Sequence, residues 1–455
     1  MSAAMPIVII ELYDSGVRIS DGKNILANSV SCALIESDDS ILVGEQAKHQ
    51  AYLRPRESSI NFWSQLSENS DTKHIISNAE IAYRHLENIW NSTNYSDQEA
   101  ILITPVNLDK HDLGLLLGIC KKLSINVAGI VCNAALAMQQ PAKDCKAVFL
   151  DLLQQQFAVT EINQDVIGLS LKQPSRILDY GLQSFINNCA KAVAKKFIAE
   201  TRFDPLHAAD DEQQFFDKLP LWVNTLSEKD SIECKLSIGE KHFTIQVENE
   251  YLQSANKKLF EETAAHLNLL FHGHNKIAIF CSSSCKQVFG FYKFLASLPG
   301  CAIVQLEEIS LAEQALRCRN EIITGEKIHY TTSLSWQDSS SPSSLDFAPG
   351  RLSNLSNIPT HILINGHAYS LHQELFIADS SVASEPRILL EKSTDSLCKI
   401  FSSGLNVEVH AFTKQSIILN NNLIKTISTA NIGDVLNIKD CEINCHFIKV
   451  INNET

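Results

Sequence analysis

The residue whose type and position most suggest chemistry is Asp151, at the end of the apolar run 147–150. A turn of leucine and glutamine follows at 153–156, and a second apolar run begins at Phe157. A carboxylate here could orient a metal ion or cap the turn, and the sequence leaves both interpretations open. Phosphate-binding hairpins use glycine at this turn, because main-chain N–H groups must approach the phosphates and φ must often be positive. Since this turn has no glycine, the sequence predicts that it has lost the phosphate chemistry.

Two further segments carry candidate ligands. The serines at 282–284 follow a predicted strand at 276–280 and precede a predicted helix at about 286–298. Their hydroxyl groups could contact a ligand, or they could form a plain turn that caps the helix. His272 and His274 have the spacing of a metal-binding pair, but they precede a strand, so we interpret them as a solvated turn.

The cysteines are a third group that could do chemistry. The chain has 13 of them, scattered without a CxxC motif. The closest pairs are Cys281 with Cys285 and Cys441 with Cys445, the last followed by His446. A zinc site would require these distant pairs to converge, so we favour reduced and mostly buried thiols, as in a cytoplasmic protein.

Composition limits the class of protein. The 455 residues are 45% hydrophobic and 20% charged, and 38 basic against 52 acidic residues give a net charge of −14. Such a charge repels phosphate backbones, so we expect no nucleic acid among the partners. No apolar run is long enough to span a membrane, and the first residues lack the features of a signal peptide. We therefore expect a cytoplasmic protein with no membrane span.

The chain has a repeated opening. Two meanders of three short strand-like runs are expected, at 7–13, 17–26 and 30–36 and again at 147–153, 156–162 and 166–171. After the first come a strand at 101–105, a helix at 109–122, a strand at 127–131 and an alanine-rich helix at 133–139. After the second comes a helix from 182 to about 202, whose apolar stripe indicates core contacts. We expect one lobe at about 1–145 and another at about 146–332.

The composition changes after the second lobe. Residues 333–359 centre on a serine-rich stretch, which predicts a flexible linker. From about residue 360 to 455, short alternating runs are separated by Asn, Gly, Ser and Asp, and no helical period is present. This pattern predicts an all-β module.

Several motifs in residues 7–330 resemble the DnaK-type heat-shock chaperone ATPases. The segment 43–50 is similar to the family's V-G-x-x-A-K-x-Q, and 101–137 resembles its strand, proline, helix, strand and alanine-rich helix, with Pro105 at the V-P position. Residues 151–159 align with D-L-G-G-G-T-F-D-V, and 181–200 with the helix that follows. The resemblance implies an α/β protein with a two-lobed actin-like ATPase fold, a duplicated ribonuclease H-like fold that binds ATP and Mg²⁺.

The chain departs from this family at the functional positions. The family's first phosphate loop, D-L-G-T-T, aligns with 11–15, where Asp14 introduces a negative charge. The glycines of the second loop are replaced at 153–155, the adenosine-side G-G-S-x-x-x-P aligns with 280–285, and no lysine occurs at 60–64. The cofactor-binding positions implied by the resemblance are degenerate, and they are Glu11, Asp151, Ser282 and Ser283.

These replacements predict a pseudo-ATPase. A non-glycine residue in the left-handed conformation costs roughly 1–2 kcal/mol. Each lost charge-assisted hydrogen bond to phosphate costs roughly 1.5–3 kcal/mol more. We therefore expect no catalytic residues, no bound metal and no cofactor, with ATP and Mg²⁺ as the alternative.

The C-terminal module resembles forkhead-associated (FHA) domains, which are β-sandwiches that usually bind phosphothreonine peptides. The matching segments are 375–379, 396–400, 418–421 and, most specifically, 431–438 with its Gly-Asp turn. The resemblance implies that a peptide would meet Ser396, Lys399 and Asn420. Asp379 replaces the family's arginine and would repel a phosphate, which favours an unmodified protein partner.

Three functions are compatible with this sequence. The first, which we favour, is a non-catalytic interaction or scaffold protein that combines a degenerate chaperone-type ATPase fold with an FHA-like partner-recruiting module. The second is a divergent ATP-binding heat-shock-type chaperone. The third is a phosphothreonine-peptide adaptor in a kinase pathway or a secretion assembly.

Overall fold

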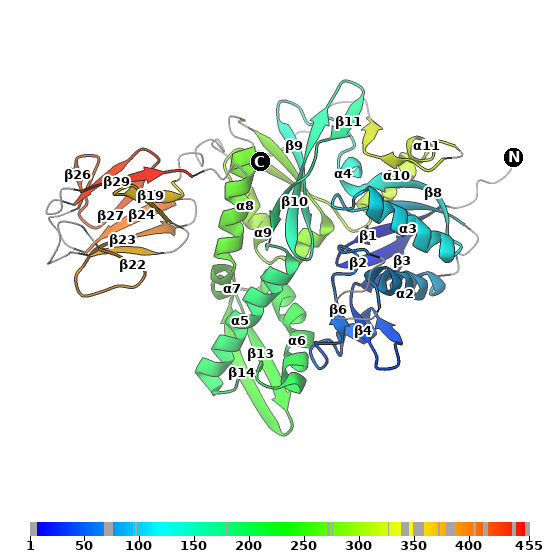
Figure 1. Cartoon of the computed structure of the whole chain (residues 1–455), viewed down its shortest axis with the longest axis horizontal. Helices are drawn as coiled ribbons and strands as arrows, with labels where there is room; N and C mark the ends of the chain where they lie inside the picture. Colours follow the sequence, from blue (N-terminus) through cyan, green and yellow to red (C-terminus); the bar gives the residue numbers. More distant parts are fainter. Residues whose placement is uncertain are drawn as a thin grey trace. The chain divides into compact units, whose positions relative to one another are not determined.

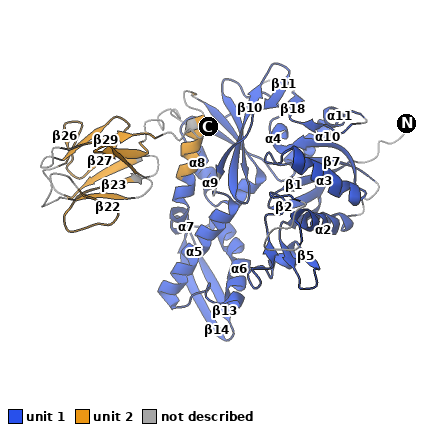
Figure 2. Cartoon of the chain, viewed as in Figure 1, with its two compact units in different colours: residues 1–260, 276–349 blue, residues 261–275, 350–455 orange. Residues whose placement is uncertain are grey.

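The chain is a mixed α/β protein with two compact units, seen in a computed structural model (Figures 1 and 2). One unit comprises residues 1–260 with 276–349, and the other comprises 261–275 with 350–455. The structure describes residues 7–67, 76–93, 95, 98–178, 180–270, 274, 276–325, 327–337, 345–348, 359–371, 374–378, 387–403, 406–412, 417–438 and 443–450.

The first sheet of the larger unit has six strands in the order β17-β8-β7-β1-β2-β3. Its strands are β1 (Ile7–Tyr13), β2 (Gly16–Ser20), β3 (Ile25–Val30), β7 (Glu99–Thr104), β8 (Asn126–Cys132) and β17 (Tyr330–Thr331). The meander β1-β2-β3 is antiparallel, whereas β7 and β8 run parallel to β1. The parallel strands are continuous apolar runs, because both faces of this part of the sheet are covered.

The second sheet repeats this topology. Its order is β16-β15-β9-β10-β11-β18, with β12 paired to β10. Its strands are β9 (Lys146–Leu152), β10 (Gln156–Gln164), β11 (Gly168–Leu171), β12 (Ser175–Leu178), β15 (Ile277–Cys281), β16 (Cys301–Gln305) and β18 (Ser333–Ser335). Here too an antiparallel meander, β9-β10-β11, is followed by two strands parallel to the first, β15 and β16. The repeated opening expected from the sequence is therefore a repeated five-strand order.

Several helices pack against the two large sheets. Near the first sheet lie α2 (Asn78–Asn91) and α3 (Lys110–Lys122), and α3 begins at a capping box formed by Asp109 and Asp112. Helix α4 (Asn133–Leu136) lies near both sheets. Helix α10 (Ser310–Arg317) contacts α4 and the first sheet, and α11 (Arg319–Ile322) follows it. A hydrophobic core cluster runs without a break from Ile101 and Val131 of the first sheet to Phe149 and Ala278 of the second.

Two smaller sheets extend this unit. One is β5-β4-β6, made of β4 (Ala33–Ile35), β5 (Ile41–Val43) and β6 (Ser58–Ser59), with α1 (Glu45–Lys48) beside it. The other is the hairpin β13 (Ser231–Ile238) and β14 (Lys241–Glu248), which contacts α5 (Leu182–Thr201) and α6 (Ala209–Glu228). The remaining helices are α7 (Asn249–Ala255), α8 (Lys257–Leu270), η1 (Ser283–Gln287) and α9 (Phe291–Ser297).

The smaller unit contains the all-β region expected from residue 360. One sheet is β20-β19-β29-β28-β25-β26 and the other is β22-β21-β23-β24-β27. Their bounds are β19 (His361–Ile364), β20 (His367–Ser370), β21 (Leu375–Ala378), β22 (Arg387–Leu389), β23 (Ser396–Ser403), β24 (Asn406–Ala411), β25 (Ile417–Leu419), β26 (Asn422–Leu423), β27 (Ile427–Ala430), β28 (Val435–Ile438) and β29 (Ile443–Ile448). Alternate residues of both sheets share one apolar core that includes Ile377, Val409 and Phe447.

Several segments differ from the sequence-based expectation. The helix expected at about 286–298 is divided into η1 and α9, with residues 288–290 between them. The third strand of the first meander is β3, not residues 30–36, because the chain leaves the sheet after Val30 and β4 pairs with β5 instead. The region assigned to a linker begins with β18, which pairs with β11. Ala348, in the same region, exchanges main-chain hydrogen bonds with Gly300 and Cys301. The serine-rich centre at 338–344 lies outside the described residues.

Candidate functional site at the paired hairpin tips

The tips of hairpins β1–β2 and β9–β10 meet inside the larger unit. The carboxylate Oδ2 of Asp14, in the first tip, accepts the main-chain N–H of Gln154, in the second, at 2.8 Å. Asp14 is 3% exposed, and its other oxygen, Oδ1, has no hydrogen-bond partner among the described residues. The Gln154 N–H is therefore already hydrogen-bonded to a side chain of the protein. Gln154 belongs to the second tip, where the sequence has no glycine.

Glu11 and Arg18 form an ion pair beside this contact. Glu11 lies in β1 and Arg18 opposite it in β2, and the Arg18 NH1 to Glu11 Oε2 distance is 3.2 Å. Both side chains are buried, and Arg18 NH1 also donates to the main-chain oxygen of Glu308 at 2.7 Å. The guanidinium therefore holds Glu11 against the segment that follows β16.

Asp151 is held by residues from two other elements. Asn133, at the start of α4, donates from Nδ2 to Asp151 Oδ2 at 2.7 Å. The hydroxyl group of Ser282 also hydrogen-bonds Asp151 and accepts the N–H of Leu152 at 3.3 Å. Asp151 is 2% exposed, so these contacts replace water around a buried carboxyl group.

Glu11, Asp14 and Asp151 are here called the carboxyl cluster, because the charge of Asp151 acts on both of the others. Burial is the main cause that raises the pKa of Glu11 and of Asp14 to about 7, and the negative charge of Asp151 raises both further. Burial also raises the pKa of Asp151, against the opposing hydrogen bonds from Asn133 and Ser282. The positive charge of Arg18 lowers the pKa of Glu11. The carboxyl cluster therefore has three carboxyl groups beside the guanidinium group of Arg18.

The second tip also accepts hydrogen bonds from the N-terminus of helix α5. The N–H groups of Leu182 and Gln183, in the first turn of α5, donate to the main-chain oxygens of Leu153 and Gln154 at 2.9 and 3.0 Å. The first N–H groups of a helix are otherwise free to bind an anion. A Cβ at Gly181 would lie 2.4 Å from the Gln154 oxygen, so glycine is required for the hairpin to approach this closely.

A second contact, here called the side latch, joins α6 to the segment after α1. Gln213 is 5% exposed, donates from Nε2 to the Lys48 oxygen at 3.1 Å, and accepts the N–H of Tyr52 at 2.9 Å. The ring of Tyr52 stacks on that of Phe216, with centroids 3.8 Å apart. Because Gln213 satisfies two main-chain groups at once, the contact has a defined geometry.

The segment 330–335 also connects the two large sheets. Its first residues form β17 beside β8 of the first sheet, and its last form β18 beside β11 of the second. Together with the shared core cluster and the side latch, this strand pairing holds the two sheets in one compact unit.

The structure brings three of the four sequence-predicted cofactor-binding residues together. Glu11 and Asp151 belong to the carboxyl cluster, and Ser282 bonds Asp151. Ser283 is half-buried at the start of η1, and its side chain has no hydrogen bond among the described residues. Ser282 precedes η1 but makes no side-chain cap there, so the interpretation of 282–284 as a capped turn is wrong for this hydroxyl.

Sequence reasoning missed the roles of Arg18, Asn133 and Gln213. Arg18 had a usable signal, since it is a charged residue between Val17 and Ile19 in an otherwise apolar strand. Gln213 had none, because a glutamine near the start of an amphipathic helix is ordinary.

In the smaller unit, the three predicted peptide-binding residues are engaged in contacts with the chain itself. Ser396 is buried, and its Oγ accepts the N–H of Ser393 at 2.9 Å. Lys399 Nζ lies 2.5 Å from Glu374 Oε1 and 4.2 Å from the ring centre of Phe401. Asp379, whose charge entered the sequence argument, lies outside the described residues.

Asn420 stabilises the turn that connects β25 to β26. Its Oδ1 accepts the N–H of Val435 at 2.9 Å, and its Nδ2 donates to Asp434 Oδ1 at 2.5 Å. Its φ of 49° lies in the left-handed region that asparagine tolerates. All three side chains therefore have structural contacts that a peptide ligand would have to share or displace.

No group of three His, Cys, Asp or Glu side chains in the described part of the chain is arranged to hold a metal ion. The described cysteines are free thiols, all buried except the half-buried Cys145. His272 and Cys441 lie outside the described residues. Within the same described part, no helix combines the length and the apolar character needed to cross a membrane.

Comparison with protein-family models and with curated proteins finds no match to this chain.

Proposed function

We propose that this chain is a non-catalytic interaction protein, in which a degenerate chaperone-type ATPase fold serves as a scaffold and an FHA-like module recruits a protein partner. The five-strand order repeated in both large sheets supports the resemblance to the two-lobed actin-like fold. The proposal depends chiefly on one observation, the buried hydrogen bond from the Gln154 N–H to Asp14.

The contacts at the paired tips oppose nucleotide binding in two ways. The main-chain donor at the second tip is already bonded to the Asp14 carboxyl group, and the nearby N–H groups of α5 are bonded to the hairpin. A triphosphate would also meet the carboxyl cluster, where Arg18 pairs with Glu11. Like charges repel strongly where water is excluded. The residues at the paired tips therefore do not fit a nucleoside triphosphate with its metal ion.

The test is a thermal-shift titration of the full chain with Mg-ATP and with Mg-ADP at millimolar concentration. We expect no change in melting temperature beyond that produced by magnesium sulfate at equal ionic strength. A saturable increase of several degrees would mean that nucleotide binds the folded state, and the divergent chaperone would become the better interpretation.

For the FHA-like module, the internal contacts of Ser396, Lys399 and Asn420 support an unmodified protein partner over a phosphothreonine peptide. A phosphate dianion requires donors and positive charge that are free to converge on it. Fluorescence polarisation with a degenerate phosphothreonine peptide library should show no binding that dephosphorylation removes. Micromolar binding lost on dephosphorylation would establish the adaptor function instead.

A further inference from the structure

The outer edge of strand β16 presents the main-chain groups of its odd-numbered residues. Among the described strands, β16 is the last in its sheet and pairs with β15 alone. At one end of this pair, the Gly300 oxygen accepts the N–H of Ile277 at 2.9 Å. At the other end, the Leu306 N–H donates to the Cys281 oxygen at 3.1 Å. Both bonds use even-numbered residues of the β16 segment, so its odd-numbered residues direct their N–H and C=O groups away from β15.

One end of this edge already bonds to the main chain of another segment. The N–H of Ala348 donates to the Cys301 oxygen at 3.0 Å, and the Ala348 oxygen accepts the N–H of Gly300 at 3.1 Å. Farther along the edge, the N–H and C=O groups of Ile303 and Gln305 have no hydrogen bond to any described residue. A row of unpaired donors and acceptors is a template on which a further strand can pair. The edge therefore binds main chain at its start and leaves the next two positions open to it.

The sequence of β16 does not discourage such pairing. Its five residues, Cys-Ala-Ile-Val-Gln, include no proline, glycine or charged residue, and two of them are β-branched. Sheet edges that must stay unpaired commonly carry a lysine, a proline or a bulge. The register with β15 is continuous over the whole strand, so β16 is a regular and uncharged edge.

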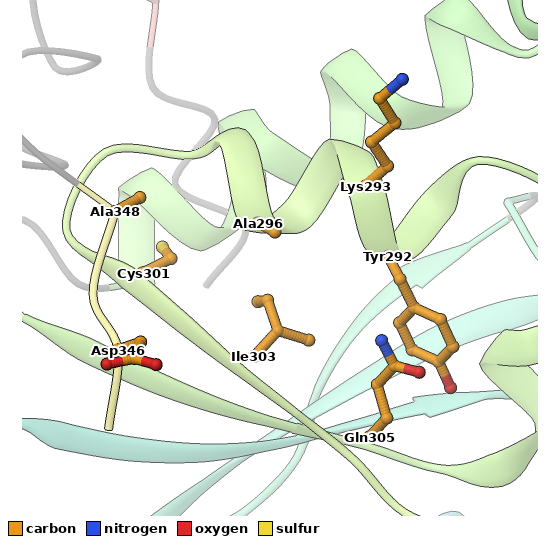
Figure 3. A pocket seen from close by; sticks show the side chains of 8 residues that line it. All are labelled: Tyr292, Lys293, Ala296, Cys301, Ile303, Gln305, Asp346 and Ala348. Atoms are coloured by element: carbon orange, nitrogen blue, oxygen red, sulfur yellow. The ribbon is translucent and has the colours of Figure 1, made fainter. Parts of the chain in front are cut away.

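A recess of about 440 Å³ beside β16 leaves room for an added chain. Figure 3 shows that Ile303 and Gln305 line it from β16, Tyr292 and Lys293 line it from α9, and Asp346 lines it from a separate segment. An aliphatic group, an amide, a phenol and both signs of charge therefore surround the same space. Such a mixed lining does not select one kind of side chain, whereas the edge beside it can recognise the main chain of any extended peptide.

We propose that the outer edge of β16 binds an extended peptide segment of a partner protein, which adds to the sheet as one further strand. The N–H and C=O groups of Ile303 and Gln305 bond to the main chain of the peptide, and main-chain bonds supply most of the affinity in this mode of recognition. The inference goes beyond the function proposed above, because it gives the larger unit a partner site of its own. It depends neither on the FHA-like module nor on the absence of nucleotide binding.

Peptides selected on the full chain from a phage-displayed library of random dodecapeptides are the probe. Each selected peptide is synthesised unmodified, N-methylated at its odd positions and N-methylated at its even positions, since successive N–H groups of a strand point to opposite edges. We expect micromolar binding of the unmodified peptide by fluorescence polarisation. One methylated form should lose at least about tenfold in affinity and the other should keep it, because only one set of N–H groups faces β16. A library that yields no binding peptide, or two methylated forms that bind equally, would overturn the proposal.

A matched pair of variants places the peptide on β16. Ile303→Pro removes one outward N–H and keeps the bonds to β15, and proline is tolerated on an edge strand where its nitrogen faces outward. Ile303→Val keeps the N–H and is the control, and circular dichroism establishes that both variants are folded. We expect the proline variant to bind the selected peptides at least about tenfold more weakly and the valine variant to bind them as the wild type does. Equal binding by the proline variant would show that the peptide binds elsewhere. A wild-type dimer in sedimentation equilibrium that Ile303→Pro dissociates would assign the edge to a second copy of the chain instead.

Discussion

Asp14 and Gln154 are 140 residues apart in the sequence and joined by a buried 2.8 Å hydrogen bond. The bond connects an acidic side chain of one hairpin tip to the main chain of the other. In a hairpin that binds phosphate, the corresponding main-chain donors face an external anion. Here the acceptor is a carboxyl group of the protein itself, so a main-chain donor of one tip is bonded to the other tip and not to a ligand.

Removing the acceptor of this bond should destabilise the protein. Asp14→Ala leaves the buried Gln154 N–H without a partner, which costs roughly 1–3 kcal/mol. Asp14→Asn keeps a carbonyl oxygen that can accept the same N–H, so its cost at pH 5 should be smaller. Urea denaturation of the two variants measures the difference, and equal stabilities would show that the hydrogen bond contributes nothing.

The carboxyl cluster should make stability depend on pH. Burial raises the pKa of Asp14 to about 7 from the 3.8 of an ordinary aspartate, so the folded chain binds more protons than the unfolded chain between these values. Its contribution to stability is therefore complete below about pH 4 and is lost as the pH rises toward 7, by up to about 1.4 kcal/mol per pH unit.

Asp14→Asn cannot titrate and isolates this contribution. We expect the variant to gain stability relative to the wild type between pH 5 and pH 8, measured by urea denaturation at each pH. Parallel curves for the two proteins would show that Asp14 has an ordinary pKa in the folded chain.

The side latch should behave as one energetic unit. The stacked rings of Tyr52 and Phe216 predict a coupling of about 0.5–1.5 kcal/mol in a double-mutant cycle with alanine. Tyr52→Ala combined with Phe243→Ala is the control, since Phe243 stacks on Phe203 instead and the two changes should be additive. Additivity of Tyr52→Ala with Phe216→Ala would mean that the latch stores no interaction energy.

Asn420 should stabilise its turn whether or not a peptide is present. Asn420→Ala removes two hydrogen bonds and places alanine, which tolerates a positive φ less well than asparagine, at φ 49°. Asn420→Gly loses the hydrogen bonds only, because glycine adopts a positive φ freely. Hydrogen exchange at Val435 in the full chain should quicken in both variants, and more in the alanine variant. Unchanged exchange would mean that the two hydrogen bonds of Asn420 do not stabilise the turn, which would leave the side chain free to bind a ligand.

The sequence predicts the elements of this protein better than the contacts between them. The second meander, the helix after Asp109 and the long helix from Leu182 were predicted correctly, because each has a strong apolar period or a cap. The third strand of the first meander was misplaced, because the apolar residues at 33–35 suit either sheet.

The site shows the same difference between local pattern and distant contact. The sequence places an acid at Asp14 and removes the glycines near Gln154, and both observations indicate a lost phosphate site. The sequence does not reveal that the Asp14 carboxyl group takes the place of a phosphate at the Gln154 N–H, because a main-chain donor has no sequence signature. The contact of Gln213 with Lys48 and Tyr52 was hidden for the same reason.

The most direct test of the central claim is isothermal titration calorimetry of the full chain with ATP in the presence of Mg²⁺. Asp14 and the hairpin carbonyl groups accept hydrogen bonds from the main-chain N–H groups that a phosphate would need. The titration should therefore give no saturable heat up to about 1 mM ATP. A dissociation constant in the micromolar range would contradict this account.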